Sequence, residues 1–234
     1  LQGDWSSDVC SSDLWFDVDA SALRVVHSDA VRNRANGIQV EISSDVVVVS
    51  TTVRDNGLVG LRVLESRQVT ISNIVAYRNR TNVAVYEGTR TQDLADVVLA
   101  NSVLMDSRTG AGALLDVQDV QRRRSATDLG ITLQADAFCR TRPGRPPLVA
   151  VWPDAHGEVA TAHDVQELAA FGDAGAAQVA CDGGTASAMF VRPAVGDFRL
   201  GPESIGRGAA APLLPPVAAA LGLAPGAPGD LGVR

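Results

Sequence analysis

The feature that most constrains how this chain can fold is an internal repeat of 23 residues. The segment GIQVEISSDVVVVSTTVRDN, residues 37–56, aligns at this offset with GLRVLESRQVTISNIVAYRN, residues 60–79. The same offset places Asn33, Asn56 and Asn79 at equivalent positions. A unit of this length does not bury its apolar residues alone, so fixed-period repeats of this kind are typical of stacked architectures.

Further copies extend the repeat on both sides. The segment LRVVHSDAVRN, residues 23–33, precedes the first copy in the same register. The segment DVVLANSVLMDS, residues 96–107, follows after an insertion of about five residues around 89–94. A more degenerate fifth copy extends over residues 113–138, with expected strand residues Leu129, Ile131 and Leu133. We therefore expect about five coils.

Within each copy, apolar residues recur at every second position. Ile38 and Val40 form one such pair, and Val46 and Val48 form a second. A period of two residues is typical of short β-strands with one buried face, and Gly, Asn, Asp and Ser at their ends favour turns. The pattern predicts an all-β parallel solenoid in which stacked coils bury a continuous apolar column. A β-sandwich, which also has short alternating strands, is the alternative fold.

The repeated asparagines suit the corners of such a stack. Asparagine tolerates the left-handed backbone conformation that a sharp corner requires. Its side-chain amide also donates and accepts hydrogen bonds, so equivalent asparagines in successive coils can bond to each other. The spacing of Asn33, Asn56 and Asn79 therefore predicts an asparagine ladder along one corner.

The distribution of proline predicts a boundary. All 11 prolines follow Arg142, and proline lacks the N–H that a strand ladder needs. We therefore expect repeats over residues 15–142 and an irregular cap over residues 143–234 that covers the last coil, with a tail that wraps the surface. One short helix is expected within residues 160–172. Its expected signals are a capping box of Thr161 and Asp164, an apolar stripe of Val165, Leu168 and Ala169, and a stop at Gly172.

Residues 1–14 do not read as part of this pattern. The string DWSSDVCSSDL within them closely resembles the in-frame translation of a common short-read sequencing adapter. We therefore expect residues 1–14 to be an artefact, and the natural chain to begin upstream of Trp15. Setting Cys10 aside leaves Cys139 and Cys181, which the sequence leaves either bridged or free.

The charge of the chain excludes several classes of function. Twenty basic residues stand against 27 acidic ones, for a net charge of −7, and all the basic residues are arginine. Nucleic-acid binders concentrate positive charge, so nucleic acid is not expected as a partner. No apolar run is long enough for a membrane-spanning helix. The absence of lysine excludes chemistry that requires an amine nucleophile or a lysine base.

The repeats at 37–56 and 60–79 resemble right-handed parallel β-helix repeats of the pectin-lyase-like superfamily. The segments GDFRLGPESIGRGA (196–209) and DLGV (230–233) are similar to the closing segment of many such bacterial proteins. The resemblance implies a right-handed parallel β-helix in a protein that acts on or binds carbohydrate. It does not specify the activity, because the superfamily contains lyases, hydrolases, epimerases, esterases and non-catalytic adhesins.

Lyases of this superfamily commonly bind acidic sugars on an outward strand face through basic side chains, often with calcium. Arginine suits that role, because its planar guanidinium pairs with a carboxylate through two hydrogen bonds. The register of the repeat places Arg54 beside Tyr77, Asp55 beside Arg78, and Gln39 beside Arg62. The expected sugar-binding residues are therefore Arg54, Asp55, Arg62, Tyr77 and Arg78. The alternative is a solvated face of weak surface ion pairs.

Catalytic and metal-binding residues are not indicated. Hydrolases of the superfamily use paired carboxylates, but Glu41, Glu65 and Glu87 occupy unequal positions in their copies. Asp17 and Asp19 are either turn residues or the remnant of a calcium or catalytic cluster. We expect no metal site and no cofactor, with calcium not specifically indicated.

These observations lead to two hypotheses. The first is an extracellular or cell-surface β-helix protein that binds or processes a polysaccharide, and the arginines favour an acidic one. It is expected to be monomeric. As an enzyme it would be a polysaccharide lyase or a glycoside hydrolase. The second is a non-catalytic structural or adhesive surface solenoid, favoured by the lack of a catalytic constellation. The expected partner is a polysaccharide.

Overall fold

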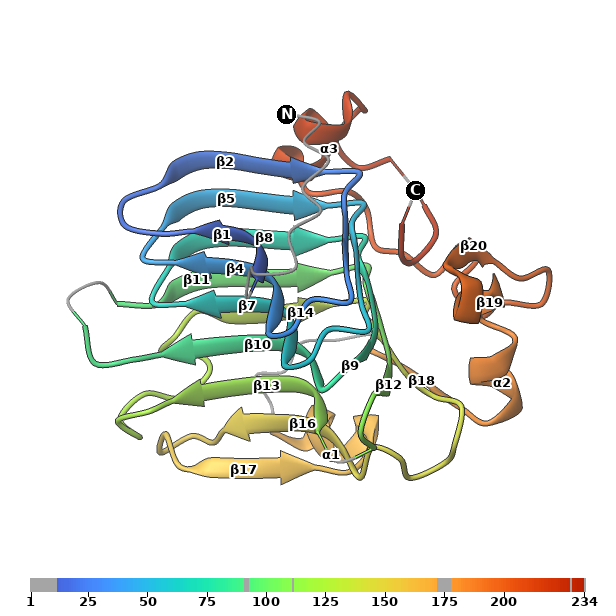
Figure 1. Cartoon of the computed structure of the whole chain (residues 1–234). Coiled ribbons are helices and arrows are strands. Elements are labelled where there is room, and N and C mark those ends of the chain that lie inside the picture. Colours follow the sequence, from blue (N-terminus) through green and yellow to red (C-terminus); the bar gives the residue numbers. More distant parts are fainter. Residues whose placement is uncertain (1–11, 91–92, 111, 172–177, 228, 234) are drawn as a thin grey trace.

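A computed structural model describes residues 12–90, 93–110, 112–171, 178–227 and 229–233 (Figure 1). Its main body consists of three parallel sheets. Sheet A contains β1 (Ser12–Phe16), β4 (Asn36–Glu41), β7 (Val59–Leu64), β10 (Thr81–Glu87), β13 (Ala113–Asp119) and β16 (Leu148–Pro153), with the antiparallel β17 (Val159–Ala162) at its edge. Sheet B contains β2 (Ser21–Val26), β5 (Ser44–Val49), β8 (Arg67–Ser72), β11 (Ala95–Ala100) and β14 (Ile131–Gln134). Sheet C contains β3 (Asp29–Val31), β6 (Thr52–Arg54), β9 (Val75–Asn79), β12 (Val103–Ser107), β15 (Ala137–Arg140) and β18 (Val179–Asp182).

The chain visits these sheets in a fixed order. From β1 to β16, successive strands lie in sheets A, B and C and then in sheet A again, and equivalent strands of neighbouring coils pair in parallel. This arrangement confirms the predicted parallel β architecture and is compatible with a β-helix or solenoid. The β-sandwich alternative does not fit, because its sheets are antiparallel.

The strand register confirms the repeat and shows where it changes. Val46 pairs with Val69, which is the offset that the repeat predicts. Leu61 pairs with Val83, one position short of that offset, whereas Val69 pairs with Val97, well beyond it. The additional residues therefore lie between β10 and β11, where the sequence predicted an insertion.

The degenerate fifth copy is only partly as expected. Ile131 and Leu133 lie in β14 and point into the core. Leu129 is also buried, but it lies in the turn that precedes β14, so its assignment to a strand was wrong.

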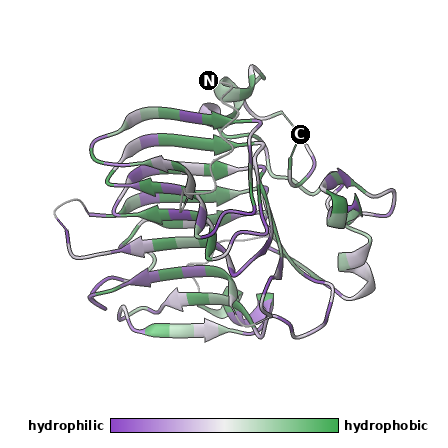
Figure 2. Cartoon of the chain, in the orientation of Figure 1, coloured by the Kyte–Doolittle hydropathy of each residue, from purple (hydrophilic) through white to green (hydrophobic). Residues whose placement is uncertain are grey.

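The core is a column of aliphatic side chains between the sheets. Val48, Ile71 and Leu61 are completely buried within it, and hydrophobic residues follow the strands in Figure 2. Complete burial of one such side chain contributes about 1.5–3 kcal/mol. The apolar alternation in the repeats is therefore the main source of stability.

The predicted asparagine ladder forms, and the backbone N–H groups of Asn33 and Asn56 donate to the same side-chain oxygens as the amides do. The Nδ2 atom of Asn33 donates to Oδ1 of Asn56 at 2.9 Å, and Nδ2 of Asn56 donates to Oδ1 of Asn79 at 2.8 Å. The left-handed conformation predicted for these asparagines is instead adopted by the residue before each: Arg32, Asp55 and Arg78 have φ of 62°, 57° and 53°. The sharp bend therefore precedes the amide that stabilises it.

The parallel stack continues past the predicted proline boundary. β16 pairs in parallel with β13, and β18 pairs in parallel with β15, although both strands follow Arg142. Pro143, Pro146 and Pro147 lie in the loop before β16, and Pro153 is the last residue of that strand. The prolines are thus placed where they do not interrupt a parallel ladder.

The predicted helix forms as α1 (Val165–Ala170), with a different cap. Asp164 is the N-cap, and its side chain accepts from the N–H of Glu167; Thr161 lies in β17. Val165 and Leu168 are buried, but Ala169 is exposed and does not belong to the apolar stripe. Gly172 lies outside the described residues.

The C-terminal segment runs along the side of the stack instead of covering only its last coil (Figure 1). It contains α2 (Gly184–Ser187), β19 (Phe190–Arg192), a 3-10 turn (Pro193–Val195), β20 (Asp197–Leu200) and α3 (Pro215–Leu221). Phe190, Phe198 and Leu231 pack on the outer face of sheet C, and Leu213 and Val217 pack on Val47 and Val49 of sheet B. The expectation that the tail wraps the surface is confirmed, and the surface it covers includes early coils.

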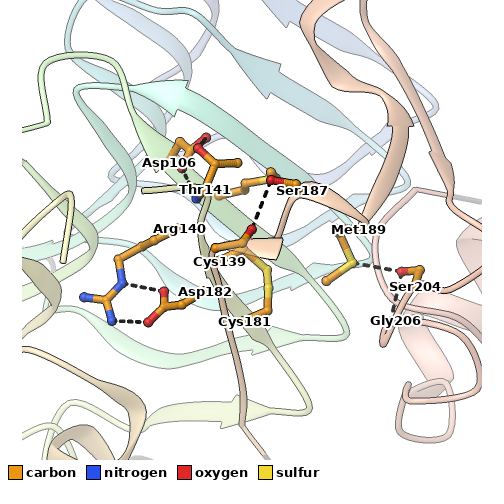
Figure 3. Close-up of a disulfide and its surroundings, with 12 residues drawn as sticks. Asp106, Cys139, Arg140, Thr141, Cys181, Asp182, Ser187, Met189, Ser204 and Gly206 are labelled. Carbon is orange, nitrogen blue, oxygen red and sulfur yellow. Dashed lines mark hydrogen bonds and ion pairs between the residues drawn. A yellow bond between two sulfur atoms is a disulfide. The ribbon is translucent and has the colours of Figure 1, made fainter. Parts of the chain in front are cut away.

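A disulfide joins two strands of sheet C. Cys139 in β15 and Cys181 in β18 are paired in register and bonded to each other (Figure 3). The next pair along the strands, Arg140 and Asp182, forms two hydrogen bonds of 2.8 Å. Of the two states that the sequence left open, the structure has the bridge. The proposed artefact, residues 1–14, lies largely outside the described residues, as does Cys10.

Candidate functional site

The residues that the repeat predicted to be neighbours lie at the carboxyl ends of β6 and β9 in sheet C. Arg54 pairs with Tyr77 across β6 and β9. Asp55 forms ion pairs with Arg54 at 3.0 Å and with Arg78 at 3.4 Å. The register of the repeat therefore placed these four residues correctly next to one another.

The C-terminal segment covers half of this strip. The ring of Tyr77 packs edge-on against Phe198 at 5.5 Å between centroids, and the residue is only 6% exposed. Burial raises the pKa of Tyr77, although the neighbouring Arg78 opposes that shift. Gly196 lies close to the guanidinium of Arg54. Arg54 and Tyr77 are thus partly or largely enclosed, and the strip is not the open outward face that the sequence predicted.

Arg62 lies apart from the other predicted residues, on the outer face of sheet A. It pairs with Gln39 on one side, as expected, and with Ala84 on the other. Its guanidinium lies over the ring of Tyr86 at 5.6 Å. The five predicted residues therefore divide between two sheets.

A basic pocket lies beside the uncovered part of the strip. Its volume is about 380 Å³, and we call it the arginine pocket after the four residues Arg78, Arg108, Arg142 and Arg145 that line it. Arg78 belongs to β9, Arg108 follows β12, and the other two follow β15. These side chains converge because β9, β12 and β15 are parallel neighbours whose carboxyl ends meet at one edge of sheet C.

The acidic residues around the pocket are already engaged. Asp106 accepts hydrogen bonds from the N–H and the hydroxyl of Thr141 at 2.8 and 2.9 Å (Figure 3). Asp55 is shared by Arg54 and Arg78, and its backbone carbonyl accepts from Arg108 at 3.1 Å. Arg142 and Arg145 are exposed and form no ion pair with any carboxylate in the described ranges.

The pocket therefore carries excess positive charge on a chain whose net charge is −7. An arginine cluster of this kind favours oxyanions such as carboxylates, which accept two hydrogen bonds from one guanidinium. Comparison of this chain with known protein families, with curated proteins and with solved structures finds no match. The function is therefore inferred from the residues of the site.

Sequence reasoning missed three of the four pocket arginines. Arg108 lies beside residues 79–80 in the next coil, where its backbone N–H donates to the carbonyl of Asn79. Arg142 and Arg145 could be placed only with the sequence offset to the following coil. Val103 pairs with Ala137, so this offset is longer than the offsets between the preceding coils. The only sequence signal was that these arginines follow the third strand of their coils.

The carboxylates considered for hydrolysis are more regular than a constant offset suggested. Because the register is one position shorter between β7 and β10, Glu65 and Glu87 occupy equivalent positions, and Asp119 pairs with Glu87 in the next coil. The assignment of Glu65 and Glu87 to unequal positions was therefore wrong. Glu41 does lie one position earlier, since it pairs with Leu64.

These carboxylates are buried and bind loop atoms. Arg90 forms ion pairs with Glu41 and Glu65, and its N–H donates to Glu65 at 2.7 Å. Glu87 accepts from the N–H of Leu94, and burial is the main reason why its pKa is raised. Burial also acts to raise the pKa of Glu41, but hydrogen bonds from Arg90 and Gln39 lower it overall. Their partners indicate that these carboxylates anchor loops.

The remaining candidates are turn residues. Asp17 accepts from the N–H of Val18 at 2.8 Å, and Asp19 has a φ of 61° in the turn between β1 and β2. Among the residues that the structure describes, no group of three or more His, Cys, Asp or Glu side chains is placed to hold a metal ion. None of the helices in the same ranges is long and apolar enough to cross a bilayer.

Proposed function

We propose that this protein binds an acidic polysaccharide at the arginine pocket. The observation that carries the proposal is the convergence of Arg78, Arg108, Arg142 and Arg145 around one pocket, with Arg142 and Arg145 free of ion pairs to described carboxylates. A ligand with carboxylates at regular intervals would supply the missing acceptors. Recognition by exposed guanidinium groups also predicts that binding weakens as salt is added.

The proposed fold is a right-handed parallel β-helix of the pectin-lyase-like type. It is supported by the internal repeat and by strands that pass through three parallel sheets in a fixed order. A stack of this kind presents side chains from successive coils at regular spacing, which suits a repeating polymer. We propose that it acts as a monomer.

The proposed location is extracellular or at the cell surface. Its support is the bond between Cys139 and Cys181, both of which are buried beneath the C-terminal segment. Disulfides of this structural kind form and persist in oxidising compartments.

A pair of double variants tests the binding function. Arg142→Ala with Arg145→Ala should weaken binding of polygalacturonate about tenfold or more, because two charge-assisted contacts are lost. Arg67→Ala with Arg122→Ala is the matched control, since it changes the net charge equally at exposed arginines outside the pocket. Affinity is measured by titration calorimetry at low salt, with a neutral glucan as a second control. Equal affinity of both double variants would disprove the proposed site.

A second candidate function is a non-catalytic adhesive or structural solenoid. It is favoured by the burial of Glu41, Glu65 and Glu87, each of which is occupied by arginine or backbone donors. Incubation of the protein with polygalacturonate should then release neither unsaturated products nor new reducing ends. Detection of either product would reject the adhesive role and favour a lyase or a hydrolase respectively.

A further inference from the structure

A second pocket lies around the corner from the first, on the outer face of sheet A. Its volume is about 290 Å³, and Arg62, Arg80, Tyr86 and Asp116 are among the residues that line it. We call it the Arg62 pocket. It is on the sheet whose outer face the C-terminal segment does not cover, since that segment packs on sheets B and C.

Arg62 has an unmet hydrogen-bonding requirement in this pocket. Its Nε atom is buried and has no hydrogen-bond partner among the described residues. A buried donor without an acceptor is costly, so such groups are rare outside sites that take a ligand or a water molecule. Arg62 therefore has hydrogen-bonding capacity that the described residues do not use.

The carboxylate in the pocket does not supply that acceptor. Asp116 accepts from the hydroxyl of Tyr86 at 2.6 Å and from the amide of Gln118 at 2.7 Å. Arg62 contacts the face of the Tyr86 ring and forms no ion pair with a carboxylate in the described part of the chain. Its positive charge is consequently available to an anion from outside.

The two pockets meet at the corner between sheets C and A. Arg80 lines the Arg62 pocket, and its carbonyl accepts at 3.0 Å from the hydroxyl of Ser107, which lines the arginine pocket. Arg78 and Arg80 flank the buried Asn79, so their α-carbons are at most about 7 Å apart. The side chain of Arg80 is exposed and forms no ion pair with a described carboxylate. Positive side chains thus continue from one pocket to the other.

We infer that the Arg62 pocket is a second oxyanion subsite, and that a polyanionic glycan bound in the arginine pocket continues across Arg80 to Arg62. This inference rests on the proposed function and specifies how the ligand is bound. Leu58 and Val59 provide apolar surface in the Arg62 pocket for the hydrocarbon face of a sugar ring. Carboxylates and sulfate esters share the required chemistry, and either would accept hydrogen bonds from the guanidinium group of Arg62.

The inference predicts that affinity depends on ligand length. An oligosaccharide that reaches both subsites gains affinity because its second contact is intramolecular. The wild-type protein should therefore bind long oligogalacturonates or long sulfated dextran oligomers at least about tenfold more tightly than trimers. The series that shows this gain identifies the oxyanion as carboxylate or sulfate.

The decisive variant is Arg62→Met, which removes the charge and retains much of the aliphatic stem. It should abolish the gain with length, because a long oligomer then has only one oxyanion subsite to contact. Arg67→Met, on an exposed arginine of sheet B outside both pockets, is the control and should keep the gain. If Arg62→Met does not fold, Arg80→Ala at the exposed corner should reduce the same gain.

The outcomes separate this inference from the function on which it rests. A gain with length that survives in Arg62→Met, or in Arg80→Ala where the first variant does not fold, overturns the second subsite and leaves binding at the arginine pocket intact. Equal affinity of short and long oligomers for the wild-type protein does the same. Failure of the wild-type protein to bind either series overturns the proposed function together with the inference.

Discussion

At the scale of single residues, the corner asparagines lie so close to glycines that no larger residue fits at the glycine positions. A Cβ atom on Gly37 would lie 2.7 Å from Nδ2 of Asn56, and one on Gly60 would lie 2.5 Å from Nδ2 of Asn79. The glycines that begin the repeats at 37–56 and 60–79 therefore leave room for the asparagine that ends the same repeat. Asparagine and glycine recur together because the ladder requires both.

A buried acid at another corner should make stability depend on pH. Asp136 is completely buried, and burial raises its pKa to about 8 despite hydrogen bonds from the N–H groups of Ser102 and Gln134. In the unfolded chain the same group ionises near pH 4. Unfolding therefore releases a proton between about pH 4 and pH 8, so the stability that Asp136 contributes is complete below pH 4 and is lost as the pH rises towards 8.

Urea denaturation from pH 4 to pH 9 measures this effect. The free energy of unfolding should fall with rising pH in the wild-type protein and fall less steeply in Asp136→Asn. Asp45→Asn, at an exposed carboxylate, should keep the wild-type slope. Identical slopes for wild type and Asp136→Asn would show that Asp136 does not titrate in this range.

At the scale of secondary structure elements, β18 is the last strand of sheet C and is attached by a covalent bond as well as by its ladder. The bridge from Cys139 to Cys181 closes a loop with a sequence separation of 42 residues, which contains β16, β17 and α1. Such a cross-link stabilises mainly by restricting the unfolded chain. Its effect should therefore be felt by the whole end of the stack.

Reduction of the disulfide should lower the free energy of unfolding by about 3–4 kcal/mol, as expected for a closed loop of this length. Guanidinium denaturation of the oxidised protein, with and without a reductant, measures the change. Cys139→Ala with Cys181→Ala should be destabilised similarly and should no longer respond to reductant. A double variant as stable as the oxidised wild type would contradict a stabilising role for the bridge.

The elements also show which parts of the fold were predictable. Strands such as β5 and β8 followed from the alternation of Val46, Val48, Val69 and Ile71, because burial in a stacked column requires that pattern. The arginine pocket did not, because its members are brought together by loops whose lengths differ from coil to coil. The cover on Tyr77 was also hidden, since Phe198 is far away in the sequence and no local pattern encodes that contact.

At the scale of the whole molecule, the C-terminal segment contacts several coils of the stack at once. The side chain of Asn101 exchanges hydrogen bonds with the backbone of Ala211, and Asn73 donates to the carbonyl of Asp230. α3 packs on Val47 and Val49 of an early coil. Stacked repeats contact only their neighbours, so this segment should make their unfolding more cooperative.

Detaching α3 tests that role. Val217→Asp places a charge in the buried contact with sheet B and should release the helix, because a buried unpaired charge is costly. Ala219→Asp, on the exposed side of the same helix, is the matched control. Limited proteolysis should cleave the tail of Val217→Asp much faster than that of the control, and its thermal transition should broaden. Equal cleavage rates would show that α3 is not held by this face.

The position of α3 also has a consequence for synthesis of the chain. The ribosome completes every strand of sheet B before it reaches residues 215–221. During that interval the outer face of β5, with Val47 and Val49, has no cover and is open to water. Newly made coils therefore expose an apolar stripe until residues 215–221 have been made, and it is at this stage that the stripe is open to self-association or to capture by a chaperone.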